Sequence, residues 1–171
     1  LQHPTSNIQH PAMSTTTEII RTLHFLSLFL MMAGLGAVIV ALWRGWREED
    51  FDRQLVAFED ASTGHKLLLL PGTIAVGATG VFLAADGEFN FFTTGWLLAL
   101  EVCYLAILFA CVPILGHALN RVQIEALKSK KRGKPTDELQ ELLDDNVPIV
   151  ICLVMVFLIP VMVWLPEFKP F

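Results

Sequence analysis

The chain has 171 residues, of which 54% are hydrophobic and 17% charged, whereas a soluble domain usually carries about 25% charged residues. This composition excludes an ordinary soluble domain, and the length allows one compact domain. The net charge of −5 comes from acidic and basic residues mixed in the same segments, with no basic stripe that would suit nucleic acid. We therefore expect a protein whose main environment is the lipid bilayer.

The segment 1–18 is polar, and its first twelve residues contain proline but no Lys, Arg, Asp or Glu. From Met13 onward, MSTTTEIIRTLHFL is typical of a protein start, so we predict that the natural chain begins at Met13. The apolar stretch that follows is too long for the apolar core of a signal peptide.

Four long apolar blocks follow in chain order. They cover residues 19–43, 67–85, 96–119 and 147–165, and 166–171 form a short tail. At about 1.5 Å of rise per residue, helices of these lengths can cross a hydrocarbon core about 30 Å thick. The blocks are continuously apolar rather than alternating, which excludes the strands of a barrel. The sequence predicts an all-α integral membrane protein, an antiparallel four-helix bundle.

Lys and Arg are unevenly distributed among the connections. Segments 44–66 and 120–146 hold four and six of them, segment 86–95 holds none, and the C-terminal tail holds only Lys169. Because such residues accumulate on the cytoplasmic side, we expect 44–66 and 120–146 to be cytoplasmic. Both termini would then lie on the other side of a membrane of the bacterial inner type. Tryptophans at the block ends suit the headgroup level: Trp43, Trp46, Trp96 and Trp164.

Segment 120–146 also contains TDELQELLDD, which begins at Thr136. Leu139, Leu142 and Leu143 share one face of a helix, so we predict a short amphipathic helix on the cytoplasmic surface. The preceding KSKKRGKP suits anionic lipid, although topology alone explains its charge.

Small residues recur every four positions in two of the blocks, a spacing that lets membrane helices approach closely. They are Ala33, Ala37 and Ala41 in the first block, and the pairs Thr73 with Gly77 and Gly80 with Ala84 in the second. Proline in the interior of a helix removes a hydrogen-bond donor, so we expect kinks at Pro113 and Pro160.

Ionisable residues are costly inside a membrane and are therefore candidates for function. His24 and Glu101 each lie five residues from the outer end of a block, about 8 Å deep, so we predict an intramembrane polar pair. His65 and His117 lie together near the cytoplasmic face. No residue set resembles a catalytic centre, and the three cysteines lack metal-binding spacing.

Three hypotheses follow from these residues. The first is haem b held between histidines of two helices, by His65 and His117 or by His24 with a weaker partner. The second is a proton or ion path that uses His24 and Glu101. The third, which we favour, is a structural role in which these side chains form hydrogen bonds, and the protein is an accessory subunit.

A family resemblance supports the membrane interpretation. LHFLSLFLMMAGLGAVIVALWR and LLLLPGTIAVGATGVFLA resemble the first two helices of small predicted integral membrane proteins of the DUF2269 type. That family is similar to the copper-resistance D and HemJ-like membrane proteins, which carry a histidine in helix one followed by a glycine-rich step. Here these positions correspond to His24, Gly34 and Gly36. The resemblance implies a four-helix bundle and keeps haem b or copper as candidate ligands through His24.

The sequence thus predicts a non-catalytic accessory subunit of a larger membrane complex, respiratory or photosynthetic. The chain has no soluble catalytic domain, and 147–165 is apolar on every side. The alternative partner is a second copy, joined through the row Ala33, Ala37 and Ala41.

Overall fold

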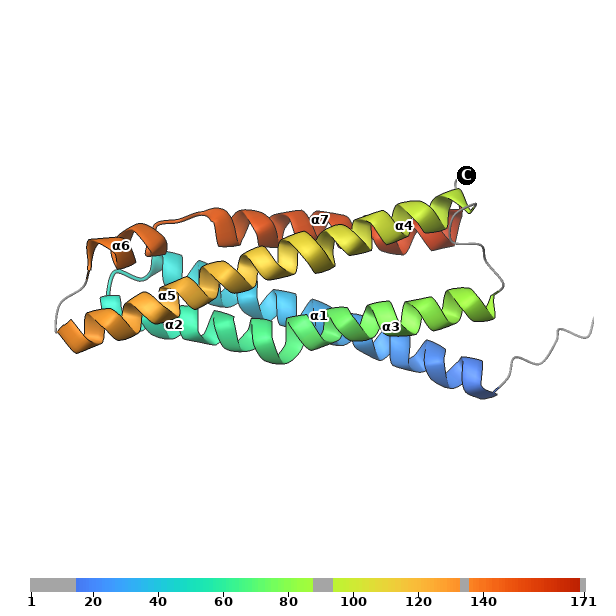
Figure 1. Ribbon diagram of the computed structural model, residues 1–171, viewed down its shortest axis with the longest axis horizontal. Coiled ribbons are helices and arrows are strands. Elements are labelled where there is room, and N and C mark those ends of the chain that lie inside the picture. Colours follow the sequence, from blue (N-terminus) through green and yellow to red (C-terminus); the bar gives the residue numbers. More distant parts are fainter. Residues whose placement is uncertain (1–14, 88–93, 133–135, 170–171) are drawn as a thin grey trace, which may run out of the picture.

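The computed structural model describes residues 15–87, 94–132 and 136–169, so the proposed start at Met13 lies outside the described residues. The described residues are helical over most of their length and contain no strand (Figure 1). The elements are α1 (Thr15–Arg47), α2 (Phe51–Gly64), η1 (His65–Leu69), α3 (Leu70–Asp86), α4 (Gly95–Ala106), η2 (Ile107–Cys111), α5 (Val112–Arg132), α6 (Asp137–Leu143) and α7 (Val147–Phe168).

Four helical segments are long and apolar enough to cross a membrane. They are Thr15–Arg47, Phe51–Asp86, Gly95–Ser129 and Asp137–Phe168. The predictions of an all-α fold and of four helices long and apolar enough to cross a membrane are confirmed. Each apolar block from the sequence lies inside one of these longer segments.

The connection 44–66 is not the loop that its charges suggested, because α2 occupies most of it and continues through η1 into α3. Asp50 caps α2, and its carboxylate accepts the N–H of Arg53 at 3.0 Å. The third segment likewise continues as helix to Arg132. Charged residues do not end these helices, so the apolar blocks are shorter than the helices that contain them.

Two wide helical turns each end just before a proline. In η1 the N–H of Leu70 bonds to the carbonyl of His65, and in η2 the N–H of Val112 bonds to the carbonyl of Ile107. Both bonds span five residues instead of four, and the next residues, Pro71 and Pro113, have no N–H to donate. The irregularity expected at Pro113 therefore takes the form of a π turn, and Pro71 has an equivalent one.

The first two segments contact each other in opposite sequence order. Gly34 of α1 lies against Leu69, and His24, ten residues earlier, lies against Thr79, ten residues later. Beyond this crossing, α1 pairs with α3 and α4 pairs with α7, so Figure 1 shows two helix pairs side by side at the end of the molecule away from α6.

Two glycines allow this crossing. A Cβ atom on Gly34 would lie 2.7 Å from the Cα of Leu69, and one on Gly72 would lie 2.6 Å from the backbone nitrogen of Met31. The predicted row on α1 divides between two surroundings. Ala41 is buried in the core and Ala37 borders Gly64 of α2, whereas Ala33 is exposed. The closest approach uses Gly34, on the neighbouring face of α1.

The buried core extends into the α2 and α6 end of the bundle. Leu139 and Leu143 of α6 are 0% and 5% exposed and belong to the same cluster as the apolar residues of the spans. The predicted amphipathic helix is present, but its leucines pack against protein rather than against the membrane surface. The helix is joined to α7 by only three residues, and it packs against α5.

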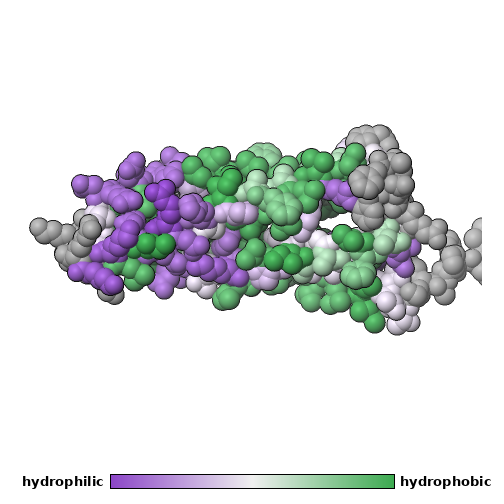
Figure 2. All heavy atoms as spheres, in the orientation of Figure 1, coloured by the Kyte–Doolittle hydropathy of each residue, from purple (hydrophilic) through white to green (hydrophobic). Residues whose placement is uncertain are grey.

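The surface divides into two zones. Hydrophilic residues gather at the end formed by α2, α6 and the later part of α5, and apolar residues cover most of the remainder (Figure 2). Phe29, Phe109 and Phe157 are more than 70% exposed in the apolar zone. Such a surface suits lipid, which agrees with the four membrane-crossing segments.

Candidate functional site

His65 joins the two π turns. It begins η1, is only 6% exposed, and its Nε2 lies 3.0 Å from the carbonyl oxygen of Val112, the residue after η2. Gly116 makes room for the ring, because a Cβ there would lie 2.7 Å from Cε1 of His65. The hydrogen bond assigns the proton to Nε2, since a carbonyl oxygen only accepts.

Two buried polar atoms beside this contact have no hydrogen-bond partner among the described residues. They are Nδ1 of His65 and Oγ of Ser62, one helical turn earlier. The next residue, Lys66, is exposed and donates to Oε1 of Gln123 on α5 at 3.1 Å. The two consecutive residues thus point to different surroundings, His65 into the protein interior and Lys66 to its surface.

His24 is bonded to the second segment rather than to Glu101. Its Nδ1 lies 2.8 Å from Oγ1 of Thr79, which itself donates to the carbonyl of Ala75 at 2.7 Å. Because the threonine proton is already engaged, His24 donates from Nδ1. Gly80 lies beneath the ring, with its added Cβ position 3.5 Å from Cε1 of His24.

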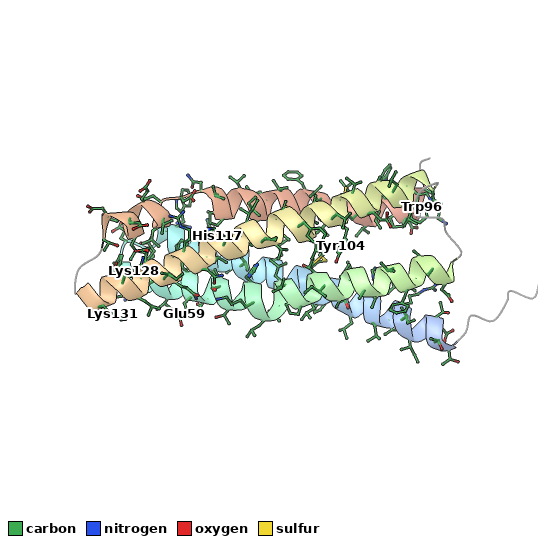
Figure 3. The ribbon with its side chains drawn as sticks, viewed as in Figure 1. Glu59, Trp96, Tyr104, His117, Lys128 and Lys131 are labelled. Atoms are coloured by element: carbon green, nitrogen blue, oxygen red, sulfur yellow. The ribbon has the colours of Figure 1, made fainter. Side chains whose placement is uncertain are left out.

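Tyr104 links α4 to α3. Its hydroxyl donates to the carbonyl of Thr73 at 3.0 Å and lies directly over Gly77, where a Cβ would overlap it (Figure 3). Glu101 lies one turn before Tyr104 and is half-buried. Within the described part of the chain, no hydrogen bond or ion pair joins Glu101 to His24. The structure thus does not bring the predicted pair into contact.

His65 and His117 do not face each other. At 100° per residue, Val112 and Gly116, which contact His65, lie on one face of α5, whereas Ile114, His117 and Arg121 lie on a different face. His117 is exposed and lines a cavity beside α6 and α7. This placement does not fit a haem ligated by both residues.

The described residues also contain no group of three or more His, Cys, Asp or Glu side chains that could hold a metal ion. Cys111 and Cys152 are buried, Cys103 is half-buried, and all three are free. Haem b, and ligation by His24 alone, stay predictions that no contact tests.

Sequence reasoning missed Tyr104 and the partners of His65. The sequence did contain signals of these contacts. Gly77 and Gly116 leave room for the side chains of Tyr104 and His65, and prolines follow the two π turns. A glycine indicates a close approach but not the approaching residue, so only the spatial pairing of the helices reveals these contacts.

The helices, their apolar surface and their internal hydrogen bonds together define a multi-pass helical membrane protein. A family model described as a predicted integral membrane protein (DUF2269) matches residues 18–170. The chain belongs to this family. No curated protein and no solved structure matches the chain significantly.

Proposed function

We propose that the protein is a non-catalytic subunit that packs against a larger membrane complex of the respiratory or photosynthetic kind. One observation carries the proposal: an uncovered strip of small residues on α1. Ala33 and Gly36 are exposed there, and a Cβ atom on Gly36 would meet nothing within 4 Å. Ala37 forms the edge of the strip, where it is exposed on one side and borders Gly64 of α2 on the other.

The chemistry of membrane packing explains why this strip suits a partner. Helices associate in lipid through close contact, and small residues let two backbones approach. Other parts of the apolar zone carry large exposed side chains such as Phe109 and Phe157. On the other side of α1, Gly34 already supports such an approach inside the protein. The strip thus offers a second helix-packing surface of the same kind.

The hydrogen bonds of the intramembrane side chains support a non-catalytic role. Tyr104 bonds to a main-chain carbonyl, His65 lies within bonding distance of another, and His24 lies within bonding distance of a threonine of the same chain. Each interaction joins two membrane segments, which is what a structural role requires.

A photoreactive amino acid placed at position 36 tests the proposal in native membranes. We expect crosslinks to one or more different polypeptides from position 36 and none above background from position 157, an exposed control on α7. Crosslinks to a second copy of the chain alone would contradict the subunit proposal and favour the homodimer.

A matched pair of variants tests the same surface without a crosslinker. Gly36→Leu adds bulk to the strip, whereas Ala78→Leu adds similar bulk to an exposed position on α3. We expect Gly36→Leu to release the partner in mild detergent and Ala78→Leu to retain it. Equal retention by both variants would argue against α1 as the contact surface.

The proposal includes no cofactor, because Nε2 of His65 lies within bonding distance of the Val112 carbonyl and His117 lies on a different face of α5 from the residues that contact His65. The absorption spectrum of the purified protein is expected to lack a Soret band. A Soret band that disappears in His65→Ala or His24→Ala would instead support the haem b alternative.

A further inference from the structure

A cavity of about 180 Å³ lies between α5, α6 and the beginning of α7. Figure 3 places His117, one of its lining residues, beside the connection from α6 to α7. This region adjoins the hydrophilic end of the molecule in Figure 2. The volume is well above the ~30 Å³ that one water occupies in the liquid. The cavity therefore has room for a small polar group at the edge of the apolar zone.

The polar lining carries charges of both signs. Arg121 and His117 lie one turn apart on α5, and Asp145 lies across the cavity, just before α7. The guanidinium of Arg121 is half-exposed, and its ion pair with Glu138 is long, at 3.9 Å. Because a guanidinium has five N–H donors, it keeps donors for an added anion.

Asp145 is held in place by the start of α7. One of its carboxylate oxygens accepts the N–H of Val147 at 2.9 Å. A carboxylate offers about four lone-pair positions, so the group retains capacity for another donor. An anion alone would face repulsion from this carboxylate, whereas a ligand with both a cation and an anion would match both sides of the cavity.

The rest of the lining is apolar and continues toward the membrane. Ile114 and Val147 line the cavity and are 44% and 43% exposed, and Val150, one turn further along α7, is 53% exposed. Ala106 and Ala110, which lead away from Ile114 toward the middle of the third segment, are also exposed. These exposed residues continue the apolar surface from the polar cavity toward the middle of the third segment.

We propose that this cavity binds the headgroup of a phospholipid that carries both a phosphate and a primary ammonium group, as phosphatidylethanolamine does. The phosphate accepts from Arg121 and His117, the ammonium donates to Asp145, and the acyl chains follow Ile114 and Val150. Phosphatidylglycerol lacks the cation that Asp145 requires. Phosphatidylcholine has a quaternary ammonium without N–H and cannot donate to the carboxylate.

Native mass spectrometry of the full chain tests this inference. The purified protein is exchanged into mixtures with equal amounts of the three phospholipids, with identical acyl chains, and the bound lipid is counted. We expect preferential retention of phosphatidylethanolamine. Arg121→Gln should lower it about five-fold, the effect of about 1 kcal/mol for one cationic side chain near a membrane surface. Asp145→Asn should abolish the preference over phosphatidylcholine.

The controls remove the same charges from the same end of the molecule. Arg53→Gln and Asp52→Asn alter exposed residues of α2 outside the cavity and should leave retention unchanged. Ala118→Phe fills the cavity without changing a charge and should expel the lipid. Arg121→Lys keeps the charge and should retain it, which separates loss of binding from loss of folding.

Three results would overturn the inference. The first is equal retention of the three lipids by the wild-type protein. The second is a preference of the wild-type protein for phosphatidylglycerol that is unchanged in Asp145→Asn. The third is binding of glycerophosphoethanolamine as tight as that of the whole lipid, which would identify a site for a soluble phosphate compound instead.

Discussion

Two glycines of α1, separated by a single residue, lie in opposite surroundings. Gly34 faces the backbone of the second membrane segment so closely that a methyl group would overlap it, whereas Gly36 faces open space. The same residue type therefore serves internal packing on one side of the helix and, in our proposal, partner binding on the other. The difference shows that a small residue in a membrane helix acquires its role from the helix opposite it.

The largest expected effect comes from breaking the internal side of this comparison. Gly34→Ala places a methyl group against main-chain atoms of Leu69, which have no rotamer that could relieve the overlap. We expect it to lower the free energy of unfolding in detergent by about 3 kcal/mol. Gly36→Ala, the matched control, should change it by less than about 0.5 kcal/mol. Similar losses for both variants would refute the assignment of the two faces.

The second effect concerns the contact between the π turns. His65→Ala removes a buried ring and its bond to Val112, so we expect a loss of about 2 kcal/mol in the free energy of unfolding. His117→Ala alters an exposed histidine of α5 that lies on a different face from the residues that contact His65, and it should cost less than about 0.5 kcal/mol. Equal losses in the free energy of unfolding would show that the contact of His65 with Val112 does not stabilise the protein.

A smaller effect is expected where Tyr104 covers Gly77. Tyr104→Phe removes the bond to the Thr73 carbonyl and should cost about 1 kcal/mol. Gly77→Ala is expected to destabilise the wild-type protein and to cost somewhat less in the Tyr104→Phe background. The hydroxyl that the methyl group would meet is then gone, although the ring carbon Cζ would still lie 2.5 Å from it. Unfolding free energies of the two single variants and the double variant measure this coupling. Strict additivity would mean that the two residues are not in contact.

The smallest effect separates the two possible partners of His24. Hydrogen bonds between membrane helices contribute about 0.6 kcal/mol on average, so a double-mutant cycle of His24→Ala with Thr79→Ala should give a coupling of about that size. The corresponding cycle with Glu101→Gln should give none that exceeds the error of measurement. Coupling of His24 to Glu101 instead would support the pair predicted from the sequence.

The membrane segments could be predicted because hydrophobicity depends only on composition and length. The blocks around Leu68, Leu105 and Leu153 needed no knowledge of their neighbours. The helical nature of 44–66 was hidden because its charges mark a position relative to the membrane and say little about the backbone.

The interactions of the candidate site were less accessible, since they depend on the register between helices. Nothing in the sequence near His65 indicates Val112, forty-seven residues later, and Gly116 gains its meaning only when that ring packs on it. Similarly, nothing in the sequence marks Thr79 as the partner of His24. The expected depth in the membrane paired His24 with Glu101, whereas the packing of α1 against α3 places His24 beside Thr79.

The most direct test of the proposed subunit role is the mass of the particle that mild detergent extracts from native membranes. We predict a particle that contains this chain, of 19.0 kDa, together with different polypeptides. We further predict that these polypeptides are lost from the Gly36→Leu variant but retained with Ala78→Leu. A single species of twice the chain mass, with no other polypeptide, would contradict the account.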